Sequence, residues 1–513
     1  MKILSAEQLR QLDRYTIEHE PVPSIELMER AAGKVFAELK QLLRHNDRIA
    51  VFCGMGNNGG DGLAIARMLV EDGYYHVDTY VVKHSPQPSS DFWENEKRLK
   101  HISGLHYIET ENQIPKLGRD AKVVDALFGT GLSRPVTGLA ASVIDAINAA
   151  GSTVYSVDVP SGLYCDELNS GEEPVIQATY TFTFHAPKFS FLLPANETYV
   201  GEFKVLNIGL HTGFADQLFS LYHYTDLWDV KTLLKPRRKF SHKGTYGHAL
   251  IAAGSYGKTG AAVLAVKAAL RGGAGLVSAL IPASGYEVMQ TGNPEAMVIN
   301  PAYISAGGVN ALNNEYLTES VVQSLTGFTA LGVGPGIGRE AATAAFLRKL
   351  LQHYTKPMVL DADALNLIAE DNSLLELMPA GSILTPHPGE FKRLVGNWEN
   401  DLVKLKLQVD FAKSHDVVVV LKGAYTTIAC PDGSIHFNST GNPGMAKGGS
   451  GDVLTGLLTA LLAQGYDAVT TAKLGVFIHG LAGDYARDAV GDYGMNASDI
   501  IRFIPKAFLR LQE

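Results

Sequence analysis

The sequence predicts an α/β protein with two doubly wound domains, each a three-layer arrangement of helices on both faces of a mostly parallel sheet. Two observations lead to this prediction. Short apolar runs alternate with helical stretches in both halves of the chain, as in βαβ units. The 513 residues are also too many for one ordinary core, since roughly 150 residues per domain is usual.

The first domain is expected to span residues 1–220. Apolar residues at helical spacing predict a helix near residues 9–17 and a second one beginning after Ser24, a suitable N-cap. A third helix, 63–69, follows a glycine-rich segment. Strands are predicted at 49–53, 77–82, 122–127, 153–157, 180–184 and 201–208.

The second domain is expected to span residues 221–513. The stretch from Thr212 to Tyr246 has few periodic residues and marks the boundary, and its basic run, Lys235 to Lys239, is interpreted as a solvated linker. Helices are predicted at 260–270 and 453–462. Strands are predicted at 248–253, 330–333, 358–360, 382–384 and 417–421.

Composition excludes several classes of protein. The net charge is 44 − 53 = −9, which gives no bias toward nucleic acid or an anionic membrane. Cys53, Cys165 and Cys430 show neither metal spacing nor a disulfide framework, so we expect a reducing compartment. No signal-peptide core and no run of about 18 apolar residues is present, and we expect a cytoplasmic protein.

The segment Gly54 to Gly62 has five glycines in nine residues. It lies between a predicted strand and a predicted helix, at the sheet edge where open α/β folds bind ligands. Glycine lets backbone N–H groups approach a phosphate, and a helix N-terminus favours anions. The segment is neither a GxGxxG fingerprint nor a P-loop, and a plain glycine-rich turn is the alternative interpretation.

Two further strand ends carry polar residues. Asp125 precedes Gly129, and Asp158 precedes Pro160 and Ser161. The ends of neighbouring parallel strands converge, and carboxylate, amide and hydroxyl oxygens suit a hard cation. An aspartate at a strand end often only caps the next helix, so neither residue is decisive alone.

Three segments together resemble the YjeF N-terminal family, the NAD(P)H-hydrate epimerases: SIELMERA (24–31), GNNGGDG (56–62) and DVPSG (158–162). The resemblance covers roughly residues 1–215 and implies a Rossmann-like fold. It implies a potassium ion held by Asn58, Asp125 and Ser161. It also implies that the hydrated cofactor is bound by Asn57, Asn58, Gly59, Gly60, Asp61, Gly129, Thr130, Gly131, Leu132, Ser133, Arg134, Pro135 and Asp158.

The chemistry of that family would fit such a site. The hydrated carbon carries a hydroxyl and a ring nitrogen, whose lone pair can expel the hydroxyl and leave a planar iminium. Water returning to the opposite face inverts the centre. A carboxylate that protonates the leaving oxygen and deprotonates the incoming water meets this need, and Asp158 is our hypothesis for it.

The strongest signal in the chain is GNPGMAKGGSGDVLTG (441–456). Glycines precede a clear helix, whose N-terminus would accept a transferring phosphoryl group. Asp452 stands at the helix start, suited to act as a base toward a substrate hydroxyl. An N-cap aspartate would account for Asp452 but not for the whole run.

Other strand ends would converge on Asp452. Lys422 begins the run LKGAYT (421–426) after an apolar strand, and His387 lies between two prolines after another. A satisfied core histidine is the alternative for His387, but this position favours a ligand contact. Gly336 follows a third strand and Asp361 a fourth.

These motifs resemble the YjeF C-terminal family, the ADP- or ATP-dependent NAD(P)H-hydrate dehydratases of the ribokinase-like superfold, over about 235–510. The resemblance implies Mg²⁺, and ADP as co-substrate, since the fused form resembles the bacterial members. It implies catalysis by Asp452 and hydrate binding by Ala261, Gly336, His387 and Asp452. The implied nucleotide-binding residues are Lys422, Gly423, Ala424, Tyr425, Thr426 and Gly451.

Two alternatives stay open at this point. A small-molecule kinase of the hydroxymethylpyrimidine or hydroxyethylthiazole type would share the loop of 448–452, but it leaves the run 57–61 unexplained. The first half could instead be a binding or scaffold module, although its strand ends keep their polar residues. The expected partners are the hydrates of NADH and NADPH and ADP, in a homo-oligomer such as a tetramer.

Overall fold

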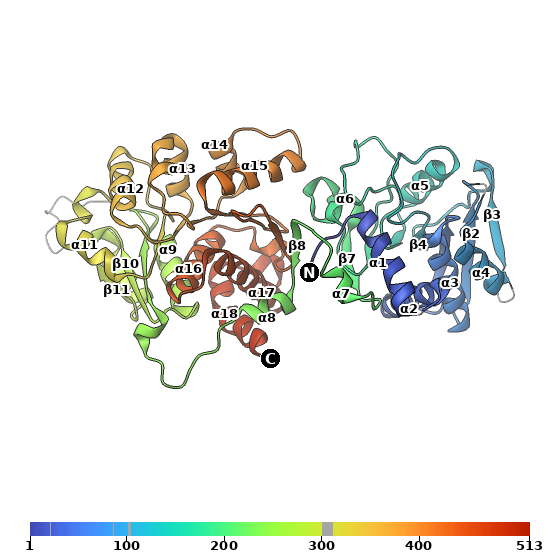
Figure 1. Cartoon of the computed structure of the whole chain (residues 1–513), viewed down its shortest axis with the longest axis horizontal. Helices are drawn as coiled ribbons and strands as arrows, with labels where there is room; N and C mark the ends of the chain where they lie inside the picture. Colours follow the sequence, from blue (N-terminus) through green and yellow to red (C-terminus); the bar gives the residue numbers. More distant parts are fainter. Residues whose placement is uncertain (21, 86, 101–103, 300–310) are drawn as a thin grey trace. The chain divides into compact units, whose positions relative to one another are not determined.

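The computed structural model describes residues 1–513 except 21, 86, 101–103 and 300–310. The chain divides into two compact units. The N-terminal unit comprises residues 2–222, and the C-terminal unit comprises Met1 and residues 223–513. Figure 1 shows the chain with many of its helices and strands labelled. None of the described helices combines the length and the apolar character that crossing a lipid bilayer requires.

The N-terminal unit is built on a parallel sheet whose described strands have the order β3-β2-β1-β4-β5-β6-β7. The strands are β1 Arg48–Cys53, β2 His76–Val82, β3 Leu105–Ile108, β4 Lys122–Ala126, β5 Thr153–Val157, β6 Tyr180–Phe184 and β7 Glu202–Leu206. The helices are α1 Ala6–His19, α2 Ser24–Leu42, α3 Asn57–Glu71, α4 Ser90–Lys100, α5 Leu139–Ala150, α6 Glu197–Val200 and α7 Thr212–Ala215. The order reverses at β1, so ligands are expected beyond the carboxyl ends of β1 and β4.

Alternate residues of the N-terminal strands pack against different helices. Val51 lies in one core cluster with Val35 of α2 and Ile65 of α3. Its neighbour Phe52 lies in another cluster with Val143 of α5. Because successive side chains of a strand point to opposite faces, the sheet is covered on both sides.

The C-terminal unit holds a larger sheet, with the described strand order β11-β10-β9-β12-β13-β14-β15-β16-β17-β8. The strands are β8 Tyr222–Thr225, β9 His248–Ala252, β10 Leu276–Leu280, β11 Met297–Ile299, β12 Ala330–Val333, β13 Met358–Leu360, β14 Ile383–Leu384, β15 Val418–Leu421, β16 Thr427–Ala429 and β17 Ile435–Asn438. Pairing is parallel from β11 to β15 and antiparallel from β15 to β17.

Helices surround this second sheet. They are α8 Leu227–Leu233, α9 Thr259–Arg271, α10 Tyr286–Gly292, α11 Glu319–Ser324, α12 Ala341–His353, α13 Asp363–Glu370, α14 Pro388–Val395, α15 Asp401–His415, α16 Ser450–Ala463, α17 Ala468–Gly494 and α18 Ala497–Gln512. Ala249 of β9 packs with Leu454 and Leu458 of α16. Leu250, on the alternate face, is fully buried as well. The predicted class, α/β with two doubly wound domains, is confirmed by the strand orders of the two sheets and the helices that cover them.

Two local predictions were wrong. Ser24 is the first residue of α2 and not its N-cap; its hydroxyl donates to Asp91 (2.5 Å). Helix α3 begins at Asn57, six residues before the predicted start, because the glycines there adopt helical backbone. The boundary stretch contains the short elements α7, β8 and α8, and its basic run is exposed, as expected.

Candidate active sites

The glycine-rich segment of the N-terminal unit is mostly the first turns of α3. A Cβ atom at Gly59 would overlap the carbonyl oxygen of Gly54. A Cβ atom at Gly62 would lie 2.6 Å from the Cβ atom of Ala126 and 2.8 Å from Sγ of Cys53. Gly56, the N-cap, is exposed with open space around it. Several of these glycines therefore serve close packing, while the start of α3 stays open to an anion.

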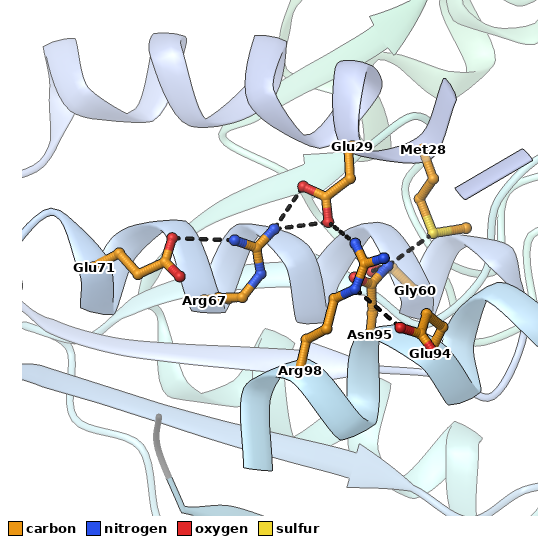
Figure 2. Close-up of polar contacts among 8 residues, drawn as sticks. All are labelled: Met28, Glu29, Gly60, Arg67, Glu71, Glu94, Asn95 and Arg98. Carbon is orange, nitrogen blue, oxygen red and sulfur yellow. Dashed lines mark hydrogen bonds and ion pairs between the residues drawn. The ribbon is translucent and has the colours of Figure 1, made fainter. Parts of the chain in front are cut away.

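Helix α3 is also held by a polar network (Figure 2). Arg67 of α3 donates to both carboxylate oxygens of Glu29 on α2, at 2.7 and 2.5 Å. Arg98 of α4 donates to the same carboxylate at 3.0 Å. The amide of Asn95 donates to the carbonyl of Gly60 at 3.3 Å. One carboxylate thus connects three helices, and the Asn95 amide holds the first turn of α3.

A cluster of oxygen atoms lies at the carboxyl end of β4. Asp125 is fully buried, and its carboxylate accepts hydrogen bonds from the hydroxyl of Ser161 (2.5 Å) and that of Ser156 (2.8 Å). The carbonyl of Phe128 accepts from the amide of Asn58 (2.9 Å), and the Phe128 N–H donates to Ser161 Oγ (2.9 Å). Asn58, Asp125 and Ser161 therefore lie close together.

The atoms of this cluster fit a hard cation. Burial raises the pKa of Asp125, and the hydrogen bonds from Ser161 and Ser156 lower it in part. The groups that contact the Asp125 carboxylate are all neutral, so a cation would balance its charge. Among the described residues, no trio of His, Cys, Asp or Glu is arranged to hold a metal. Amide, hydroxyl and carbonyl oxygens would complete the ligand set.

Asp158 lies beside this cluster of strand ends and lines a cavity of about 60 Å³. Its backbone has φ +63°, a left-handed conformation that is uncommon for non-glycine residues. The buried ammonium of Lys188 lies 2.9 Å from the Asp158 carboxylate. The hydroxyl of Thr183 (3.3 Å) and the N–H of Phe184 (3.2 Å) donate to the same oxygen. Thr130, from the predicted substrate loop, also lines the cavity.

Of the predicted substrate residues of the N-terminal unit, Thr130 and Asp158 line this cavity, and the others lie elsewhere. Asn57 is exposed at the start of α3, and Asp61 is buried one turn further on. Burial raises the pKa of Asp61 well above its usual range, and the charges of Asp158 and Asp13 add to the effect. The run 129–135 is mostly exposed or half-buried, as a ligand-covering loop would be.

In the C-terminal unit, the predicted phosphate loop ends at the start of α16. Gly449 is the N-cap, with φ +96°, and Asp452 belongs to the first turn. The hydroxyl of Ser450 and Nε2 of His479 are buried, and neither has a hydrogen-bond partner among the described residues. Free N–H groups of a first helical turn and unsatisfied buried polar atoms both favour a ligand here.

Lys422 follows β15 and lies between Asp361, which follows β13, and Gly451, at the start of α16. Its ammonium lies 2.9 Å from the buried carboxylate of Asp361, which also accepts from the hydroxyl of Thr455 (2.7 Å). A Cβ atom at Gly451 would lie 3.3 Å from Lys422 Nζ. Burial raises the pKa of Asp452 to about 6, helped by Asp361 and opposed by Lys422. A base poised near neutral pH can accept a hydroxyl proton.

The remaining predicted residues of this unit have distinct local roles. His387 is the N-cap of α14: its Nδ1 accepts from the N–H groups of Gly389 and Glu390, and its side chain is half exposed. Gly336, with φ +64°, approaches Ala261, and its carbonyl accepts from Ser255 (2.7 Å).

The run 423–426 forms a turn in this unit. Gly423 and Ala424 are exposed there, and Thr426 closes the turn by hydrogen bonds to Gly423. Tyr425 is half-buried in the same turn. Exposed backbone next to Lys422 leaves this turn accessible to a nucleotide.

Comparison with known proteins agrees with both sites. A family model described as NAD(P)H-hydrate dehydratase matches residues 249–506, and one described as YjeF-related protein N-terminus matches residues 24–190. The bifunctional NAD(P)H-hydrate repair enzyme of Moorella thermoacetica is 38% identical, over 100% of this chain and 98% of that protein. The enzyme of the same name from Coxiella burnetii is 36% identical, over 96% of each.

The chain belongs to the family of bifunctional NAD(P)H-hydrate repair enzymes. Both resemblances drawn from the sequence motifs are thereby confirmed. A solved structure of an ADP/ATP-dependent NAD(P)H-hydrate dehydratase from Bacillus subtilis, co-crystallised with ATP and Mg²⁺, is 28% identical. It covers 56% of this chain and 98% of that one, with a TM-score of 0.45.

Sequence reasoning missed several residues of this repair enzyme's candidate sites. Asp13 and Lys188 line the cavity with Asp158, and Asp361 and Thr455 surround Lys422. A single lysine inside the apolar run 186–193 was a usable signal for Lys188, because an isolated buried charge needs a partner. Nothing in the spacing of α1 distinguishes Asp13 from a solvent-facing residue.

Proposed function

We propose that this member of the family carries out both repair reactions. Residues 1–220 would interconvert the R and S hydrates of NADH and NADPH. Residues 221–513 would dehydrate the S hydrate at the expense of ADP, giving AMP and phosphate. The observation that carries the proposal is a pair of sheet-edge sites in one chain, one at Asp158 and Lys188 and the other at Asp452 and Lys422.

Dehydration needs a better leaving group than hydroxide. In the proposed reaction Asp452 takes the proton of the hydrate's hydroxyl, whose oxygen attacks the β-phosphorus of ADP, and the bond to AMP breaks. Loss of phosphate and of the adjacent ring proton then restores the dihydronicotinamide. The raised pKa of Asp452, about 6, supports its role as the base.

The other residues of the dehydratase would bind its two substrates. Ala261, Gly336, His387 and Asp452 would contact the hydrate. The nucleotide would contact Gly451 and the turn that begins with Lys422, namely Lys422, Gly423, Ala424, Tyr425 and Thr426. Mg²⁺ would neutralise the nucleotide phosphates, which usually complete its coordination beside one or two carboxylates. Asp361 and Asp452, both within electrostatic reach of Lys422, fit that need.

The epimerase residues would likewise divide into two groups. Potassium would be held by Asn58, Asp125 and Ser161, where it would neutralise the buried carboxylate and order the strand ends. The hydrate would contact the start of α3 and the exposed loop, namely Asn57, Asn58, Gly59, Gly60, Asp61, Gly129, Thr130, Gly131, Leu132, Ser133, Arg134 and Pro135. Asp158 would act at the reacting carbon as acid and base.

We also propose a cytoplasmic homo-oligomer, such as a tetramer, without nucleic-acid partners. The excess of acidic over basic side chains supports the last point. Cys53, Cys165 and Cys430 are all free thiols, which supports a reducing compartment. Light scattering of the purified chain would measure the oligomeric state.

One assay tests both activities. Both epimers of NADH hydrate are mixed with the full chain and ADP, and the absorbance of regenerated NADH is followed. Complete recovery is expected. Recovery that stops near half would leave only the dehydratase, and no recovery with either ADP or ATP would refute the proposal. A stable phosphorylated product by ³¹P NMR would instead favour the kinase alternative.

A further inference from the structure

Two carboxyl groups line the cavity of the N-terminal unit. Asp158 enters it from the end of β5, and Asp13 enters it from α1, a helix that carries no sequence motif. Lys188, His185 and Thr130 are the other polar residues of its wall. An acid and a base are both needed for an exchange of hydroxyl for water, so the second carboxyl requires an explanation.

The two carboxyls lie in different electrostatic surroundings. Asp158 forms an ion pair with Lys188, whose side chain is 2% exposed, and accepts two further hydrogen bonds. Because the ammonium of Lys188 is buried, it needs a counter-ion, and the Asp158 carboxylate is the one that lies beside it.

Among the residues that the structure describes, none forms an ion pair with Asp13 as Lys188 does with Asp158. Burial raises the pKa of Asp13 to about 6, the charge of Asp158 adds to the rise, and Lys188 opposes it. Asp13 thus keeps its proton at pH values where an exposed aspartate has lost it. The cavity thus combines a carboxyl of raised pKa, Asp13, with one that is paired to a buried lysine, Asp158, an arrangement that separates the roles of acid and base.

We propose that Asp13 is a second catalytic residue of the epimerase, the general acid that protonates the departing hydroxyl, while Asp158 is the general base. This inference rests on the proposed epimerase function of residues 1–220. It revises the assignment of both roles to Asp158 alone.

Asp13 gives its proton to the hydroxyl oxygen, the carbon–oxygen bond breaks with its electron pair on oxygen, and water leaves. The ring nitrogen's lone pair forms the carbon–nitrogen double bond of the iminium. A second water attacks the opposite face and gives a proton to Asp158, while the double-bond pair returns to nitrogen.

Asp13 and Asp158 can also catalyse the reverse epimerisation, and no third catalytic residue is needed for it. After one turnover the proton has moved from Asp13 to Asp158. In that state Asp158 can protonate the hydroxyl of the opposite epimer, and Asp13 can deprotonate the water. The reaction in one direction therefore leaves the proton on the carboxyl that must donate it in the other direction.

Two neighbouring groups are weaker candidates for the acid. His185 lines the cavity, but burial and Lys188 lower its pKa to about 4, so it holds no proton to give near neutral pH. Asp61 is buried and carries a raised pKa, yet it does not line the cavity. Its substitution therefore serves as the competing outcome of the test.

The test measures epimer interconversion by chromatography, with the full chain and no ADP, from roughly pH 5 to 8. Wild-type kcat/KM should fall above about pH 6 as Asp13 ionises. Asp13→Asn should lower kcat by roughly 10²–10⁴-fold and abolish that alkaline limb. Formate should restore part of the rate in Asp13→Ala, which a purely structural role would not allow.

The controls separate the possible failures. Glu18→Gln removes an exposed carboxylate from the same helix and should leave rate and pH profile unchanged. Calorimetry of the N-terminal transition in each sample reports whether the unit that holds Asp13 is folded, and ADP-dependent dehydration of the S hydrate reports the same for the C-terminal unit. A wild-type rate and alkaline limb in Asp13→Asn, or loss of the limb in Asp61→Asn instead, would overturn the inference. If Asp13→Asn does not fold, a wild-type profile without an alkaline limb would overturn it as well.

A wild-type chain that does not interconvert the epimers would refute the proposed function itself. That outcome is distinct from one in which the wild type interconverts the epimers and Asp13→Asn does so at the same rate.

Discussion

Gly62 lies where α3 packs closely against the sheet of the N-terminal unit, and a larger residue there should separate the two. A Cβ atom there would lie 2.6 Å from Cβ of Ala126 and 2.8 Å from Sγ of Cys53, whereas ordinary contacts begin near 3.4 Å. Helix α3 would have to retreat by roughly 3.4 − 2.6 = 0.8 Å in Gly62→Ala. The Cβ atom of Ala126 moves only with the backbone of β4, so no flexible side chain can absorb the shift.

The expected magnitude combines two opposing effects. Overpacking of a filled core costs about 1–3 kcal/mol, and alanine favours a helix over glycine by about 1 kcal/mol. Gly62→Ala should therefore destabilise the N-terminal unit by about 1 kcal/mol. Gly33 in α2 is the matched control, because a Cβ atom there meets nothing within 4 Å. Gly33→Ala should stabilise the unit by about 1 kcal/mol.

Calorimetry of the full chain measures both variants. Since 1 kcal/mol shifts the midpoint of a domain of this size by about 2–4 °C, the two variants should differ by several degrees in the N-terminal transition. Equal midpoints would show that α3 does not require glycine at this position. The close-packing explanation of the segment would then be wrong.

Three further predictions concern the charged groups. Asp452→Asn should lower the ADP-dependent rate of NADH regeneration by roughly 10²–10⁴-fold and spare epimer interconversion; in the wild type that rate should fall as the pH drops below about 6 and Asp452 loses its charge. Glu29→Gln should destabilise the N-terminal unit by about 1–2 kcal/mol in a denaturant titration, because Arg67 and Arg98 are only partly exposed; an unchanged midpoint would contradict this. The raised pKa of Asp13 means that the folded state binds its proton more tightly, so stability should decline as the pH rises from about 4 to about 6; in calorimetry Asp13→Asn should weaken that decline.

The sequence allowed the sheet-edge sites to be located before the structure was known. Asp125 and Ser161 follow different strands, and the carboxyl ends of parallel strands converge. Lys422, at the end of β15, meets Gly451 in the first turn of α16, at the same edge of the second sheet. The glycine segment was harder to interpret, because a glycine that admits a ligand and one that admits a neighbouring strand look identical in sequence. Gly62 is of the second kind.

The sequence by itself determined the fold class, the family and the strand ends that carry Asp158 and Asp452. These depend on periodicity and on local motifs, which lie within short stretches of chain. Only the tertiary structure decided that Asp13 and Lys188 share a cavity with Asp158. The three residues lie in separate segments of the chain, and burial in that cavity, which no local pattern encodes, is what gives Asp13 its altered pKa.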